Sequence, residues 1–299
     1  MFEIIAELDI PLLFKPLETA QGLCLPKPLR GIMITTRRTL SIQRFTAAHE
    51  LGHLMLDHEA SIDLEILERG PLGPDKGRDL QEVAADAFAA EFMLPRWLYG
   101  YHIQRQGWSV AELRNPNVTY QLSLRMGASY EATCWGLLSH QILKRPEVDA
   151  LRKEKVANMK ARLGDGFRPA DSWADVWRFT ERDDGGVIGS TERDLVRLEL
   201  PENSSAGYEW DVGILREAGL EILDDRSEFN EDPVIYGAPA KRRVMARPLT
   251  SDRRTVSLIE SQPWSPSNDS RLTVTLNFDG AETGGLSKAE RRRVGAMPA

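Results

Sequence analysis

The chain is poor in the two residues that most often bind transition metals: among 299 residues there are only two cysteines and five histidines. The cysteines, Cys24 and Cys134, lie far apart and outside any metal-type spacing, which argues against a disulfide framework or a cysteine-based zinc site. We expect two free thiols in a reducing cytoplasm. Positive charge is not in excess either, and the formal net charge of −7 argues against direct, non-specific binding of nucleic acid by the whole protein.

Long apolar stretches are missing as well. No run approaches the length of a membrane-spanning helix, so we expect no membrane segment. Residues 1–22 carry acidic residues and a proline inside the apolar stretch, which argues against a secretory signal peptide. These absences predict a cytoplasmic protein, and its length is sufficient for two domains.

Two of the five histidines nevertheless stand in one H-E-x-x-H motif formed by His49, Glu50 and His53. Histidines four residues apart share one face of a helix, so both imidazoles can bind one metal ion, with the glutamate beside the metal-bound water. A β-rich run over 31–36 predicts a strand, and the periodicity of 41–56 predicts a helix with its first residue, a serine, as the N-cap. The alternative is a buried histidine pair that is satisfied by hydrogen bonds.

A catalytic zinc ion needs a third protein ligand. The alanine-rich segment 80–94 predicts a second helix, on which Glu82 and Asp86 share a face. Two carboxylates on so apolar a helix are unfavourable to bury unless they are paired or bind metal. We therefore predict that Glu82 ligates one catalytic Zn²⁺ with the two histidines and that Asp86 accepts a hydrogen bond from His49. The alternative places both acids on a solvated face; Glu91, the competing acid, is predicted to lie on the surface.

The two helices together resemble the ImmA/IrrE family of metallopeptidases. The resemblance rests on 45–53, on 82–90 and on the Leu94-Pro95 that follows, and it covers about residues 1–143. Asp86 stands where that family has asparagine, which brings the site closer to the Glu-x-x-x-Asp pattern of the gluzincins. Family members cleave helix-turn-helix transcriptional repressors, often in stress responses or within mobile elements. The resemblance therefore implies a zincin-like fold with a small antiparallel sheet and a repressor of this kind as the protein substrate.

The sequence does not identify the donor that stabilises the oxyanion. Tyr101, His102 and Tyr120 are candidates, although each is better explained as a surface or packing residue. His58 is expected at the C-terminal end of the first helix, where it interacts favourably with the helix dipole. Residues 109–143 are expected to be helical, and 122–132 within them predict two helices joined by a tight glycine turn. We interpret this region as a packing subdomain rather than a DNA-binding helix-turn-helix, because clustered Lys and Arg are missing.

Composition changes near residue 145. The following segment is charged and helical in pattern, with Trp173 and Trp177 four apart on one face. Beyond it, short runs of alternating apolar and polar residues predict an immunoglobulin-like β-sandwich. The predicted fold is thus multidomain α+β with four parts: a zinc metallopeptidase domain (1–145), a helical linker (146–186), a sandwich (187–279) and a flexible basic tail (280–299).

Three stretches of the sandwich, 200–210, 236–240 and 262–264, resemble the loop signatures of chagasin-like cysteine-peptidase inhibitors. Two loop glycines of that family are missing, and Gln262 replaces its arginine. The alternative is that these residues are retained as good turn formers. The resemblance implies the following candidates for partner binding: Asn203, Gly207, Tyr208, Gly237, Pro263 and Trp264.

The sequence therefore predicts a zinc-dependent endopeptidase whose C-terminal sandwich recognises the substrate or regulates the site. One rival is a peptidase inhibitor or antitoxin-like binding protein that acts through the sandwich on a peptidase or another protein partner. A weaker rival is a DNA-binding regulator that uses residues 120–143.

Overall fold

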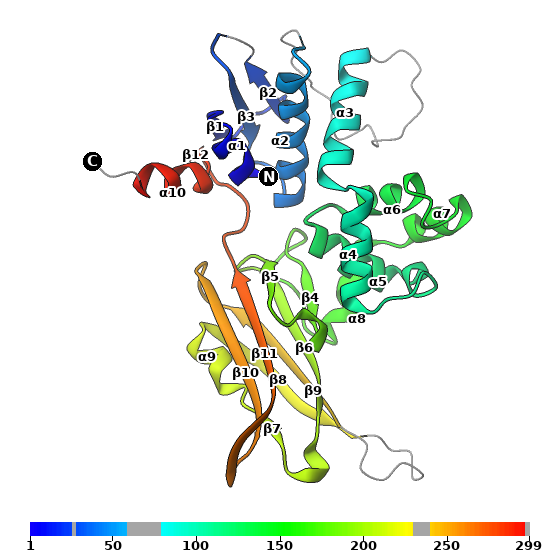
Figure 1. Ribbon diagram of the computed structural model, residues 1–299, viewed down its shortest axis with the longest axis vertical. Helices are drawn as coiled ribbons and strands as arrows, with labels where there is room; N and C mark the ends of the chain where they lie inside the picture. The colour runs from blue at the N-terminus through cyan, green and yellow to red at the C-terminus, as the bar shows by residue number, and fades with distance from the viewer. Residues whose placement is uncertain (26–27, 59–78, 230–239, 297–299) are drawn as a thin grey trace. The chain divides into compact units, whose positions relative to one another are not determined.

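The computed structural model describes residues 1–25, 28–58, 79–229 and 240–296, with the side chains of 265–269 excepted. The chain divides into two compact units (Figure 1). The boundaries fall inside α4 (Arg96–Gln106) and α5 (Pro116–Met126), before the last residue of α7 (Arg145–Lys153) and after Gly280. The first unit contains Met1–His102, Leu122–Arg152 and Ala281–Ala299, and the second contains Ile103–Gln121 and Lys153–Gly280.

A small sheet forms one layer of the first unit, after the short helix α1 (Phe2–Glu7). Its strands follow the order β12-β1-β3-β2. β1 runs parallel to β3, whereas β2 and β12 run antiparallel to their neighbours, so the sheet is mixed and not antiparallel throughout as expected. The strand bounds are Leu12–Lys15 for β1, Gly22–Leu25 for β2, Gly31–Thr35 for β3 and Gly285–Leu286 for β12.

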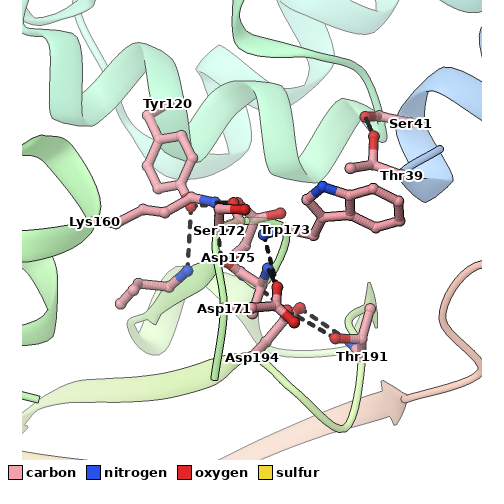
Figure 2. Close-up of polar contacts among 12 residues, drawn as sticks. Thr39, Ser41, Tyr120, Lys160, Asp171, Ser172, Trp173, Asp175, Thr191 and Asp194 are labelled. Atoms are coloured by element: carbon pink, nitrogen blue, oxygen red, sulfur yellow. Dashed lines mark hydrogen bonds and ion pairs between the residues drawn. The ribbon is translucent and has the colours of Figure 1, made fainter. Parts of the chain in front are cut away.

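The helix α2 (Leu40–Met55) carries the H-E-x-x-H motif and packs on β2 and β3 (Figure 1). Its N-cap is Thr39 and not Ser41 as predicted; the two hydroxyl oxygens lie 3.2 Å apart (Figure 2). Every second residue of a strand points to the same face of the sheet, and residues three or four apart share one face of a helix. The apolar residues at these positions face each other between the sheet and α2 and form a single core. The core contains Ile5, Ile10, Leu12, Phe14, Cys24, Ile32, Ile34, Ala47, Leu51 and Leu54.

The predicted second helix is present as α3 (Leu80–Met93), which packs against α2. The carboxylate of Asp79 caps it by accepting a hydrogen bond from the backbone N–H of Gln81. α5 and α6 (Tyr130–Ser139) confirm the predicted helix pair, and Gly127 turns the chain between them with φ of +65°. Within the described ranges no helix is long and apolar enough to cross a membrane.

The C-terminal segment does not form the flexible tail that its composition predicts. β12 pairs with β1, and α10 (Lys288–Ala296) contacts α1. Gln43 of α2, which is fully buried, binds the backbone of Glu282 in both directions: its Nε2 donates to the carbonyl at 3.0 Å and its Oε1 accepts from the N–H at 2.9 Å. Arg293 pairs with Asp9 at 2.6 Å. The basic residues thus take part in long-range contacts that local composition cannot reveal.

The second unit is built around two four-stranded sheets, with the orders β5-β11-β10-β7 and β4-β6-β9-β8. The predicted strands over 195–200, 256–260 and 272–276 lie within β6, β10 and β11. The strand bounds are β4 (Val176–Phe179), β5 (Gly186–Gly189), β6 (Leu195–Glu202), β7 (Glu209–Trp210), β8 (Leu220–Glu228), β9 (Ala240–Pro248), β10 (Arg253–Gln262) and β11 (Ser265–Asn277).

The segment predicted as a helical linker is helical only in its first half. α7 (Arg145–Lys153) and α8 (Val156–Gly164) are present, but Trp177 lies in β4 and Trp173 in the loop before it. The shared helical face was therefore a wrong prediction. β4 is held by its parallel pairing with β6 and by buried Asp194, which accepts a hydrogen bond from Asp175 N at 2.8 Å (Figure 2). Asp194 also accepts a hydrogen bond from Trp177 Nε1 at 3.2 Å. These contacts are long-range, and they start the sandwich before residue 187.

Candidate metal centre

His49, His53 and Glu82 meet at the contact between α2 and α3. The Nε2 atoms of the two histidines lie 3.0 Å apart, and the Glu82 oxygens lie 3.3 Å from His49 Nε2 and 3.5 Å from His53 Nε2. All three side chains are buried, and their ligand atoms lie within 4.8 Å of one another. Ligands at about 2.0–2.1 Å from a tetrahedral zinc ion are roughly 3.3 Å apart. The observed separations therefore fit one metal ion.

Gly52 allows the two helices to approach closely enough for this cluster. A Cβ atom at this position would lie 3.1 Å from the Phe88 ring and 3.3 Å from the Cα and carbonyl oxygen of Ala85. Ala85 and Ala89 are fully buried on α3. Small residues on both helices thus bring the α3 carboxylates within reach of the α2 histidines.

Asp86 lies beside His49, with its Oδ1 2.9 Å from the histidine Nδ1. Donation of this N–H fixes the tautomer whose Nε2 lone pair faces the cluster. Burial disfavours the charged imidazole, but the hydrogen bonds to Asp86 and Glu82 outweigh it and raise the pKa of His49 to about 10. Without metal His49 keeps a proton near neutral pH, and metal binding must displace that proton.

His58 provides an outer partner for the other histidine: its Nδ1 lies 3.1 Å from His53 Nδ1. Burial and then the neighbouring His53 lower the pKa of His58, which favours its neutral form. The sequence predicts only an interaction of His58 with the helix dipole and not its contact with His53. The presence of a third histidine five residues after the motif could have indicated this contact.

The charges around the cluster also fit a divalent cation. Glu50, Glu82 and Asp86 place three carboxylates in a buried region, where uncompensated negative charge is strongly unfavourable. One protonated histidine compensates only one of them, whereas a divalent ion between two neutral imidazoles compensates two. Two imidazole nitrogens and one carboxylate are a donor set typical of catalytic zinc.

The residues considered as oxyanion donors have other surroundings. The Tyr120 hydroxyl donates to Asp175 Oδ1 at 2.7 Å (Figure 2) and accepts from the backbone N–H of Val176 at 3.2 Å, so it holds β4. Tyr101 is 49% exposed, and its ring contacts His102. These contacts support the packing and surface roles expected for them.

Two of the three chagasin-like loops lie together at one end of the sandwich. A Cβ atom on Gly207 would lie 2.3 Å from the Trp264 ring, so the glycine makes room for the tryptophan, which is 72% exposed. Gln262 Nε2 donates to the Ala206 carbonyl at 2.8 Å. The backbone N–H of Asn203 donates to the buried Glu260 at 2.7 Å. Pro263 is exposed and Tyr208 is half-buried in the same loops, whereas Gly237 lies outside the described residues.

Two known protein families match separate parts of the chain. Residues 5–137 match the IrrE N-terminal-like domain of peptidase family M78. The first domain is a metallopeptidase of this family. Its buried His49, His53 and Glu82 are the candidate zinc ligands of the H-E-x-x-H-plus-glutamate type. Residues 191–278 match the chagasin family of peptidase inhibitors, I42.

Individual proteins match about a third of this chain. Amoebiasin-2 of Entamoeba histolytica is 24% identical over 107 residues, which are 36% of this chain and 86% of that protein. The crystal structure of the cysteine protease inhibitor EhICP2 from Entamoeba histolytica aligns at 21% identity and a TM-score of 0.29, over 35% of this chain and 95% of that one. The solution structure of amebosin aligns at 18% identity and a TM-score of 0.27, over 35% and 96%.

The contact between Asp86 and His49 generates a prediction about metal affinity. Replacing Asp86 with Ala removes the acceptor that orients the His49 ring, and we expect zinc affinity to fall about 10–100-fold. Competition with a chromophoric chelator measures this change. Glu91→Ala, which removes an exposed acid from the same helix, is the matched control and should bind zinc like the wild type. Wild-type affinity in the Asp86 variant would contradict the orienting role.

Proposed function

We propose that the protein is a zinc-dependent endopeptidase in which His49, His53 and Glu82 hold the ion and Glu50 acts as the general base. The observation that carries this proposal is the convergence of the three buried ligand atoms, with separations of 3.0, 3.3 and 3.5 Å. The motif on α2 places Glu50 directly after the first ligand. The match of the first domain to family M78 supports the same chemistry.

Each side chain has a defined task in peptide hydrolysis. A zinc ion held by His49, His53 and Glu82 would supply Lewis acidity, which would lower the pKa of a water molecule toward about 7 and polarise the scissile carbonyl. Glu50 takes the proton of the attacking water on its carboxylate and later delivers it to the leaving amine. Asp86 keeps the His49 ring oriented, and the buried surroundings of the site strengthen these electrostatic interactions.

The proposed substrate is a helix-turn-helix transcriptional repressor. This part of the proposal is supported by the resemblance of the first domain to the ImmA/IrrE family, whose members cleave such proteins. Cleavage of a repressor would make the enzyme a regulator of transcription, in a stress response or a mobile element. We propose that the sandwich recognises this substrate or regulates access to the peptidase domain.

A single substitution tests the catalytic part of the proposal. Glu50→Gln removes the base but no ligand, so the variant should still bind one zinc ion per chain while cleavage slows by at least about 100-fold. We would incubate both zinc-loaded proteins with a panel of purified helix-turn-helix repressors and identify new N-termini by mass spectrometry. Cleavage by the variant at the wild-type rate would refute the general-base role. A wild-type enzyme that leaves every repressor intact would refute the substrate class.

The exposed Trp264 held against Gly207 favours a second candidate function, inhibition of a papain-like cysteine peptidase by the sandwich loops. In that case the full chain should inhibit papain, and Trp264→Ala should weaken inhibition about 30-fold, as expected for a tryptophan at the centre of an interface. Trp173→Ala is the matched control, because Trp173 is 50% exposed in the same unit but outside these loops. Papain activity unaffected by the wild-type chain would refute this function and leave substrate recognition as the role of the sandwich.

A further inference from the structure

The general base faces an edge strand. Glu50 is 2% exposed on α2, and α2 packs on β2, which is the terminal strand of the sheet order β12-β1-β3-β2. Gly22 and Cys24 are two residues apart on β2 and both are buried, so they share the strand face turned toward the core. Neither residue belongs to the H-E-x-x-H motif or to α3.

Gly22 leaves the space that the base occupies. A Cβ atom at this position would lie 2.7 Å from Glu50 Oε1 and 3.0 Å from Glu50 Cγ, and 2.6 Å from the Cγ2 of Thr46. Thr46 and Glu50 are one helical turn apart and are both buried, so neither can move away freely. An alanine at position 22 must therefore displace the carboxylate or the helix.

Cys24 supplies a donor beside this space. Its side chain is 4% exposed on the strand face that also carries Gly22, and Glu50 is the neighbouring acceptor for its thiol. Burial first, and then the charge and hydrogen bond of Glu50, raise the pKa of Cys24 to about 12, so the thiol stays protonated and donates at neutral pH. A buried carboxylate needs such donors, and one oriented oxygen leaves the other available to a water molecule.

We propose that β2 positions the general base: Gly22 provides the space for the Glu50 carboxylate, and the Cys24 thiol donates a hydrogen bond that orients it. This inference rests on the proposed role of Glu50 and adds two positioning residues to the site. It also gives the edge strand a part in catalysis through its buried side-chain face. Gly22 and Cys24 act through Glu50 and touch neither substrate nor metal in this account.

The S–H stretching band in the infrared spectrum tests the contact directly. In a Cys134→Ser background the band reports Cys24 alone, and a hydrogen bond to a carboxylate lowers its frequency. We expect Glu50→Gln to move the band to higher frequency, because a neutral amide is a weaker acceptor than a carboxylate. Gly22→Ala should move it in the same direction by displacing Glu50. Gly31→Ala is the matched control, because a Cβ atom on this neighbouring strand would meet nothing closer than 3.7 Å.

Kinetics on a repressor cleaved by the wild type then test the consequence for catalysis. Cys24→Ala should lower kcat about tenfold with KM changed less than twofold, whereas Cys24→Ser, which keeps a donor, should retain most of kcat. Cys134→Ala removes the other buried thiol, in α6, and should leave both constants unchanged. All variants should keep their zinc, because the ligands are intact.

The outcomes separate this inference from the proposed function. An S–H band that is identical in the wild type, Glu50→Gln and Gly22→Ala would overturn the positioning role even if Glu50→Gln is inactive. Equal kcat values for Cys24→Ala and the wild type would overturn it as well. Undiminished cleavage by Glu50→Gln would instead refute the general-base proposal, whatever the band shows.

Discussion

The burial of three carboxylates around two imidazoles is the constraint on which the first domain depends. Glu50, Glu82 and Asp86 are each at most 7% exposed, and His49 and His53 are buried beside them. Such a concentration of negative charge is unfavourable away from water unless cations and hydrogen-bond donors compensate it. A divalent metal ion bound by His49, His53 and Glu82 would remove most of the excess negative charge.

The surrounding structure meets this constraint with small residues and paired donors. Gly52 and Ala85 bring α2 and α3 close together, so that Glu82 and Asp86 reach His49. On the other side of α2, the missing side chain of Gly22 leaves space for Glu50. His49 is thus fixed by a carboxylate on α3, while the base is enclosed by β2. The zinc ligand His49 and the base Glu50 both lie on α2, and each is positioned by a residue of another element.

Much of the site could be predicted because its ligands obey local rules. A four-residue spacing on each of two helices predicts His49 with His53 and Glu82 with Asp86 as pairs that share a face. The partner of His53, His58, could not be predicted in the same way, because it follows the end of α2 and helical periodicity no longer applies. The contact between Cys24 and Glu50 joins a strand to a helix, and no local pattern encodes such a pairing.

The wrong predictions about secondary structure also arose where long-range contacts decide the conformation. The spacing of Trp173 and Trp177 suits a helix, yet pairing with β6 makes a strand of Val176–Phe179. The basic composition after residue 280 suggests disorder, yet β12 completes the sheet by pairing with β1, about 270 residues earlier. Local propensity was overridden by long-range pairing in both cases. The sandwich itself was predictable, because its strands are long enough for the alternation of apolar and polar residues to be recognised in the sequence.

The most direct test of the account is X-ray absorption spectroscopy at the zinc edge of the purified, zinc-loaded protein. The spectrum should show one zinc ion per chain with only nitrogen and oxygen ligands at about 2.0–2.2 Å, including the scattering pattern of two imidazoles. Sulfur at about 2.3 Å would contradict it, because Cys24 would then be a ligand and not a partner of the base. A chain that binds no zinc in stoichiometric amount would contradict it altogether.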